Sequence, residues 1–146
     1  MPVSHELAVQ VRWSEADPAG IVFYPRFFEW FDLATEALFE SLGLPWPEIF
    51  PRYRIIGVPI VESGARFSAP VRYGDRVRIR STVVEVGART FRVAHEVGVG
   101  STNCATGFEV RAWVAGPEEP GGRLRAQPLP AEVARRLRGE APGPVA

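Results

Sequence analysis

Two kinds of hydrophobic periodicity mark the first third of the chain. Apolar and polar positions alternate over residues 6–13, which predicts a half-buried strand whose apolar members are Leu7, Val9, Val11 and Trp13. A helix is predicted from Tyr24 and Pro25 to about Leu42, because proline suits the first helical position and Gly43 provides a stop signal. Apolar residues cover most of its circumference, so we expect other elements to enclose this helix.

The rest of the chain is dominated by β-branched residues with period-two stretches. Strands are predicted over 55–61, 65–71, 76–86, 90–99 and 107–115, with turns at 74–75, 87–88 and 98–103. Three arginines within 76–80 share one face, as expected for the solvated face of an antiparallel sheet. A short strand over 123–127 and a basic helix over 131–138 complete the order of elements. This order predicts a single α+β domain over residues 1–138, with a flexible tail over 139–146.

The composition excludes several classes of function. The 146 residues carry a formal net charge of zero, so nothing indicates a general affinity for nucleic acid or anionic membranes. All 17 basic residues are arginines, which excludes Schiff-base lysine chemistry and the P-loop lysine. Two distant histidines and one cysteine do not form a clustered metal site, and no Gly-x-Ser-x-Gly nucleophile elbow occurs. The chain shows no signal peptide and no apolar run of membrane-spanning length, and Cys104 has no internal disulfide partner; a cytoplasmic protein is therefore expected.

One carboxylate in the segment before the predicted helix is a candidate for chemistry. Asp17 lies in an Asp-Pro-Ala-Gly turn between the first strand and the helix. The free N–H groups at a helix N-terminus favour negative charge, so a carboxylate beside them forms a candidate hydrolytic site. The alternative role for Asp17 is structural, as a helix cap or an Asx turn.

The segment over residues 11–39 resembles the signature of the 4-hydroxybenzoyl-CoA thioesterase family. The resemblance rests on the run Asp17-Pro18-Ala19-Gly20-Ile21-Val22 followed by Tyr24-Pro25. It continues through 57–61, 65–67, 73–75, 122–126 and 129–130, and so covers the chain apart from its tail. This family has the hotdog fold, in which an antiparallel sheet wraps one long helix. The Asp-Pro-Ala-Gly loop indicates its aspartate-loop type.

The resemblance implies hydrolysis of an acyl-CoA to a free acid and CoA, with an aromatic acyl group favoured. Asp17 matches the family's catalytic carboxylate, which acts as a nucleophile or as a general base toward water. Tyr24 matches the position whose backbone N–H polarises the thioester carbonyl. No metal or organic cofactor is implied. Family members pair their sheets edge to edge, which implies a homodimer or homotetramer with active sites at the dimer interface.

Further assignments from the resemblance concern substrate binding. Asp32, within the apolar helix, could accept a hydrogen bond from a phenolic substrate; the alternative is a structural bond to a backbone group or an arginine. Phe27, together with Phe28, is a candidate either for the acyl pocket or for the core. The family places basic residues for the CoA phosphates where this chain has Arg89, with Thr90 beside it, Arg123 and Arg125.

Several alternatives stay open at this point. Glu15, Glu36 and Glu62 are rival acids, although each is explained more simply by a surface or salt-bridged position. His95 shares a predicted strand face with apolar residues, which is typical of a packed or interface residue. The rival functions are a short-chain acyl-CoA thioesterase of the Tol-Pal-associated type, which often has histidine where Pro25 stands, and a non-catalytic protein that binds acyl-CoA.

Overall fold

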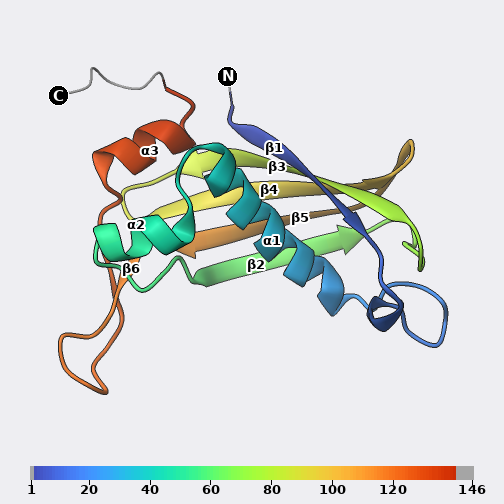
Figure 1. Cartoon of the computed structure of the whole chain (residues 1–146), viewed down its shortest axis with the longest axis horizontal. Coiled ribbons are helices and arrows are strands. Elements are labelled where there is room, and N and C mark those ends of the chain that lie inside the picture. Colours follow the sequence, from blue (N-terminus) through green and yellow to red (C-terminus); the bar gives the residue numbers. More distant parts are fainter. Residues whose placement is uncertain (1, 141–146) are drawn as a thin grey trace.

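A five-stranded antiparallel sheet packs against one long helix, and together they form most of the molecule (Figure 1). The structure is a computed structural model that describes residues 2–140. The strands lie in the order β1 (Ser4–Gln10), β3 (Arg76–Val86), β4 (Thr90–Val99), β5 (Thr102–Ala112) and β2 (Ile60–Phe67). The helix α1 (Pro25–Ser41) crosses one face of this sheet. The predicted α+β hotdog architecture is therefore confirmed.

Strand β3 shows how the residue pattern produces the two faces of the sheet. Val77 and Ile79 are buried under α1, whereas Arg76, Arg78 and Arg80 are exposed on the opposite face. The predicted solvated face is therefore confirmed. Strands β3 and β4 also have the predicted bounds.

The helix α1 begins at Pro25 as predicted, and the chain turns away from it at Gly43, whose φ of +72° favours glycine. Its buried side faces the sheet and consists of Phe27, Trp30, Phe31, Ala34, Thr35, Leu38 and Phe39. The expectation that other elements enclose the helix holds for only one side of it in the single chain. Asp32 and Leu33 are exposed on its outer side, because the sheet covers only one face of the helix.

Several predicted strand boundaries are wrong. The first strand ends at Gln10, and Trp13 begins a 3₁₀ turn, η1 (Trp13–Glu15), with its side chain 77% exposed. The strands predicted over 55–61 and 65–71 are replaced by the single strand β2, because Gly57 (φ +156°) and Pro59 interrupt the first of them. The strand predicted over 107–115 begins earlier, as β5, and continues past Trp113 into β6 (Val114–Ala115).

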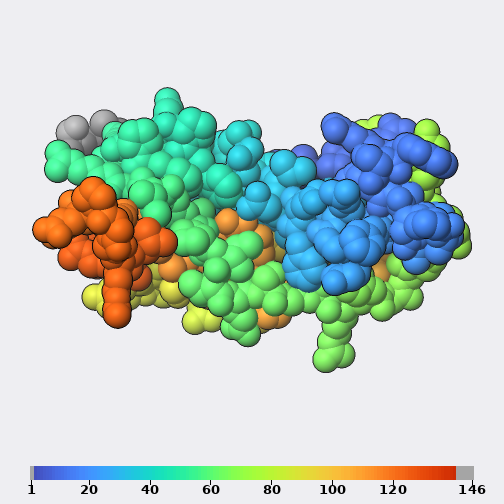
Figure 2. Space-filling view, turned by 90° about the horizontal axis from the view of Figure 1, so that it is seen from below, coloured from blue at the N-terminus to red at the C-terminus, as the bar shows by residue number. Residues whose placement is uncertain are grey.

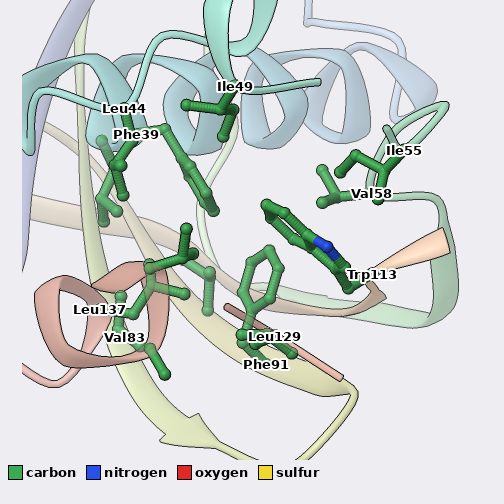
Figure 3. Packing of buried hydrophobic residues seen from close by; sticks show 14 residues of the cluster. Phe39, Leu44, Ile49, Ile55, Val58, Val83, Phe91, Trp113, Leu129 and Leu137 are labelled. Atoms are coloured by element: carbon green, nitrogen blue, oxygen red, sulfur yellow. The ribbon is translucent and has the colours of Figure 1, made fainter. Parts of the chain in front are cut away.

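Two short helices close one end of the molecule. The helix α2 (Trp46–Arg52) was not predicted, because its prolines read as a helix stop although proline is well tolerated in the first turn. The helix α3 (Ala131–Leu137) and the short strand β7 (Arg125–Ala126), which pairs with β6, lie within their predicted segments. Figure 3 shows side chains from α2 and α3 packing with Phe39, Phe91 and Trp113 in the core at this end. Residues 141–146 of the predicted tail lie outside the described residues.

Strand β2 forms an open edge of the sheet, because only its β5 side is paired within the described chain. Figure 2 looks onto this edge, where the green atoms of β2 face the viewer below the blue and cyan atoms of α1. Three large apolar side chains on the strand are exposed: Ile60, Val61 and Phe67. An edge strand that exposes apolar side chains is typical of a pairing surface.

Candidate active site

Asp17 lies in a hydrogen-bonded turn that leads from β1 toward α1. The Asp17 N–H donates to the Ile21 carbonyl at 2.9 Å, and the Gly20 N–H donates to the Asp17 carbonyl at 2.9 Å. The Ala19 N–H donates to Asp17 Oδ1 at 2.8 Å, which is the Asx turn that the sequence raised as the structural alternative. Within residues 2–140 no hydrogen bond engages Oδ2. One carboxylate oxygen therefore fixes the turn, while the other is available for chemistry.

Tyr24 forms the N-cap of α1, directly after this turn. The Phe23 N–H donates to the Glu15 carbonyl at 3.0 Å, and the Phe27 N–H donates to the Tyr24 carbonyl at 3.1 Å, so the backbone is held on both sides. The Tyr24 N–H itself has no acceptor within the described part of the chain. Because Pro25 has no N–H, Tyr24 supplies an open donor at the positive end of the helix dipole.

A largely apolar hollow of about 410 Å³ lies beside Tyr24, between the start of α1 and the segment after β2. Its walls are Ile21, Val22, Tyr24, Phe27, Phe67, Ser68, Ala69, Pro70 and Val71. Phe27 is buried and makes an edge contact with Phe67, with ring centroids 4.9 Å apart. Phe27 thus belongs to the core and also lines the hollow, so the two roles considered for it are compatible.

The rival acid Glu15 is already engaged in the structure. Its Oε1 accepts the Arg12 N–H at 2.7 Å, and its Oε2 accepts the Trp30 indole N–H at 2.9 Å. Both oxygens of the Glu15 carboxylate therefore accept a hydrogen bond, and the carboxylate links η1 to α1. Glu62 is exposed on β2 and Glu36 is half-buried on α1.

Asp32 makes the bond to an arginine that was one of its two predicted roles. Arg111 donates through Nη2 to Asp32 Oδ1 at 2.6 Å. The Asp32 side chain is nevertheless 56% exposed, whereas Arg111 is only 4% exposed. The carboxylate therefore faces solvent while a buried cation holds it.

A buried polar network lies behind Arg111, between α1 and the sheet. Glu109 accepts hydrogen bonds from Arg111 at 2.7 Å and from Thr35, and it lies 3.0 Å from His95 Nε2. His95 Nδ1 is 2.8 Å from the Ser81 hydroxyl, and its ring stacks on Phe31. Burial by itself raises the pKa of Glu109, but the hydrogen bond from His95 and the charge of Arg111 outweigh it and lower the pKa to about 2. His95 is thus a packed residue, as predicted.

The arginines assigned to CoA phosphates lie at the other end of the molecule. Arg89 is exposed in the β3–β4 turn with Thr90 half-buried beside it, while Arg123 and Arg125 are exposed near β7. The Trp113 N–H donates to the Arg89 carbonyl at 2.9 Å, and the Trp113 carbonyl accepts the Gln127 N–H at 2.7 Å. Trp113 thus holds these two segments side by side. Arg125 also donates to Glu118 at 2.5 Å.

Within one chain, the predicted site residues fall into two groups. Asp17, Tyr24 and Phe27 gather at the start of α1, which is the right-hand end of Figure 1. The β6–β7 hairpin with its arginines lies at the left-hand end. Asp32 lies eight residues along the helix from Tyr24, a rise of about 12 Å. A single chain therefore does not bring all the predicted residues together.

The prediction from the sequence did not include Arg111, Glu109 or Trp46. Trp46 lines a second hollow, of about 300 Å³, next to Arg111, whose guanidinium carbon is 5.5 Å from the Trp46 ring centroid. In residues 2–140 no cluster of three or more His, Cys, Asp and Glu side chains is placed to hold a metal ion. None of the helices in that range is long and apolar enough to cross a membrane.

An antiparallel sheet packed on one central helix is the arrangement of a hotdog-fold thioesterase. The chain matches the Thioesterase-like superfamily over residues 11–137 and belongs to this family.

Known relatives agree in sequence and in structure. The chain is 30% identical to the 4-hydroxybenzoyl-CoA thioesterase of Pseudomonas sp. (strain CBS-3), over 84% of this chain and 89% of that protein. The solved structure of that thioesterase has a TM-score of 0.84 at 29% identity, covering 91% of this chain and 98% of that one. A mutant of 4-hydroxybenzoyl CoA thioesterase with an aspartate-to-asparagine change, complexed with 4-hydroxybenzoyl CoA, has a TM-score of 0.83 at 28% identity, covering 93% of this chain and 99% of that one. The 1,4-dihydroxy-2-naphthoyl-CoA hydrolase of Synechococcus sp. (strain CC9902) is 29% identical, over 70% of this chain and 71% of that protein.

Proposed function

We propose that this thioesterase hydrolyses an aromatic acyl-CoA, of the 4-hydroxybenzoyl-CoA kind, to the free acid and CoA. The observation that carries the proposal is that the segment leading into α1 contains both an uncommitted Asp17 oxygen and the open Tyr24 N–H. The aromatic preference is supported by relatives whose substrates are 4-hydroxybenzoyl-CoA and 1,4-dihydroxy-2-naphthoyl-CoA.

In the proposed reaction the Tyr24 N–H donates a hydrogen bond to the thioester carbonyl oxygen. This oxygen gains negative charge as the carbonyl carbon becomes tetrahedral, and one preorganised donor of this kind is worth roughly 10²–10³ in kcat. Asp17 either attacks the carbonyl carbon or removes a proton from the attacking water. In both cases the C–S bond breaks and CoA leaves as a thiolate that takes up a proton. If Asp17 is the nucleophile, a mixed anhydride with its carboxylate remains, and water hydrolyses it to release the acid and restore Asp17. If Asp17 is the base, the attacking water supplies the new C–O bond and the acid is released directly. Because a thiolate leaves readily, the site needs no strong general acid.

Asp32 is the proposed acceptor for a hydroxyl on the acyl group. The Arg111 bond uses only its Oδ1, and no hydrogen bond within the described residues engages Oδ2. An exposed carboxylate with one free oxygen can accept a hydrogen bond from a phenol hydroxyl. An acyl ring without a hydroxyl has no such donor. Arg89, Thr90, Arg123 and Arg125 are proposed to bind the CoA phosphates, since arginine suits phosphate geometry.

We propose that a second copy of the chain completes the site, in a homodimer or homotetramer. The open edge of β2 exposes Ile60, Val61 and Phe67, and sheets can extend by pairing such edges. If two β2 edges pair antiparallel, the Asp17 end of one chain faces the opposite end of its partner, where the arginines are exposed, and Asp32 lies between the two ends, midway along α1. This arrangement would unite the two groups of residues that one chain keeps apart. A cytoplasmic location stays a prediction; the buried free thiol of Cys104 is compatible with it.

The test of the proposed function is thiol release from a panel of CoA esters: 4-hydroxybenzoyl, benzoyl, phenylacetyl, butyryl and palmitoyl. Asp17→Asn should abolish turnover while retaining substrate binding, because the amide keeps the shape of the carboxylate but is not a base. The matched control is Asp75→Asn. Asp75 is also a half-buried turn aspartate, and its Oδ2 accepts the Arg72 N–H at 2.8 Å.

Each outcome of this panel has a distinct meaning. Turnover that favours an aryl ester and depends on Asp17, but not on Asp75, supports the proposal. A preference for the butyryl ester would replace it with the short-chain thioesterase. Binding of CoA esters without any turnover would replace it with the non-catalytic function.

A further inference from the structure

The second hollow, next to Arg111, lies where the chain approaches strand β2. Trp46 and Phe50 from α2 form one wall with their rings stacked, at a centroid distance of 5.6 Å, and Val58, Pro59 and Leu124 form others. Arg111 contributes to the lining and is the cation closest to Asp32. This hollow is distinct from the one beside Tyr24, which shares none of its residues.

Arg111 bonds to three separate parts of the fold. Its Nη1 donates to the Val58 carbonyl at 3.0 Å, and its Nη2 donates to Glu109 at 2.7 Å and to Asp32 at 2.6 Å. Val58 belongs to the segment that leads into β2, Glu109 to the sheet and Asp32 to α1. A planar guanidinium can make these bonds at fixed angles, whereas the single nitrogen of a lysine cannot span them.

The polar side chains behind Arg111 bond to one another. Ser81 and His95 Nδ1 share a hydrogen bond, and Glu109 is bonded to His95 Nε2, to Thr35 and to Arg111. Glu109 is buried on all sides and cannot move to follow Arg111 outward. The guanidinium is therefore anchored from within the protein, and the only carboxylate among its partners that reaches solvent is Asp32.

We propose that Arg111 is a positioning residue for acyl-group selection: it holds the Asp32 carboxylate and the Val58 wall in place, so that a hydroxyl on the acyl ring donates to Asp32. The proposal rests on the proposed function, because it requires an aryl-CoA substrate. Its ligand class is a hydroxylated aryl thioester. In the proposed dimer, the ring of a thioester held at the Asp17 site of one chain would pack against the apolar and aromatic walls of the hollow in the other chain. Its hydroxyl would donate to the Asp32 carboxylate, which Arg111 links to that hollow.

The experiment compares kcat/KM for 4-hydroxybenzoyl-CoA with that for benzoyl-CoA, and uses their ratio as the readout. A hydrogen bond to a charged group corresponds to roughly a 10–100-fold difference. Asp32→Asn and Arg111→Lys should each lower the ratio by about tenfold or more. Adding Arg111→Lys to Asp32→Asn should lower it no further, because both changes remove one interaction. Arg92→Lys is the matched control: this half-buried arginine lies over the Phe108 ring on the outer face of the sheet, and the ratio should stay as in the wild type.

Four results would overturn the inference. An equal loss of kcat/KM for both esters in Arg111→Lys would indicate a purely structural role, and an unchanged ratio would exclude positioning. A wild-type enzyme that hydrolyses both aryl esters equally would refute the selection while leaving the proposed function intact. Absence of turnover on every ester would instead refute the proposed function, and the inference with it.

If Arg111→Lys does not fold, the double variant Glu109→Gln with Arg111→Met removes both buried charges together. It keeps an acceptor for His95 and Thr35, and replacing a buried ion pair as a unit is often tolerated. The same loss of ratio is expected from this variant, and a wild-type ratio in it would overturn the inference.

Discussion

The Asp17 turn depends on a glycine in a backbone conformation that other residues avoid. Gly20 has a φ of +81°, and a Cβ added there would meet no atom within 4 Å. Gly20→Ala therefore introduces no clash, and its whole cost is the strain of the left-handed conformation, about 1–2 kcal/mol. For a chain of this size that strain corresponds to a fall in Tm of roughly 2–8 °C.

The same substitution should also reduce catalysis. Gly20 donates to the Asp17 carbonyl, and its neighbour Ala19 donates to the Asp17 carboxylate. If the alanine relaxes toward negative φ, both bonds are disturbed and the free carboxylate oxygen moves. A misplacement of about 1 Å can cost on the order of 10²-fold in rate, so we expect kcat to fall by roughly 10–100-fold.

Gly100→Ala provides the matched control. Gly100 lies in the β4–β5 turn with a φ of +58° and likewise has open space around the added Cβ. The two variants should show similar losses of Tm in thermal unfolding, but only Gly20→Ala should slow thiol release. Equal kcat in both variants would refute the reasoning, as would a Gly20→Ala protein as stable as the wild type.

Three further predictions concern binding and stability. Replacing Arg123 and Arg125 together with alanine should raise KM for CoA esters more than it lowers kcat, because phosphate contacts bind ground and transition states alike; an unchanged KM would remove both from the binding site. The pKa of Glu109 is lowered from 4.5 to about 2, so ionised Glu109 contributes about 3 kcal/mol to the free energy of unfolding. This contribution should be present above pH 5 and be lost as the pH falls toward 2. Denaturant titrations over that pH range should show this loss in the wild type, and a smaller one in Glu109→Gln. Trp30→Phe should lower the free energy of unfolding by roughly 1–3 kcal/mol, because it removes the indole donor to Glu15; an unchanged denaturation midpoint would contradict this.

Local patterns predicted the parts of the fold and site that local interactions determine. The helix from Pro25 and the alternation in β3 and β4 were predictable because proline, glycine and period-two burial act within a few residues. Asp17 was singled out for the same reason, since it lies in a short turn before the helix, whereas the role of Tyr24 was implied by the resemblance to the family. The helix α2 was missed because two prolines were taken as a stop, although one is its N-cap and the other lies in its first turn.

The Asp32 partner could not be predicted because its interaction is not local. In residues 108–112 apolar and polar positions alternate, and the simplest assignment turns Phe108 and Val110 inward and Glu109 and Arg111 toward solvent. The structure has the opposite arrangement, with Glu109 and Arg111 buried. Burial of both charges is possible only because His95 on the neighbouring strand and Asp32, 79 residues earlier in the chain, complete their hydrogen bonds. Charged side chains can take the inward positions of an alternating strand only where the tertiary fold supplies such partners. The inverted alternation around Arg111 therefore indicates that this part of β5 has a role beyond packing in the core.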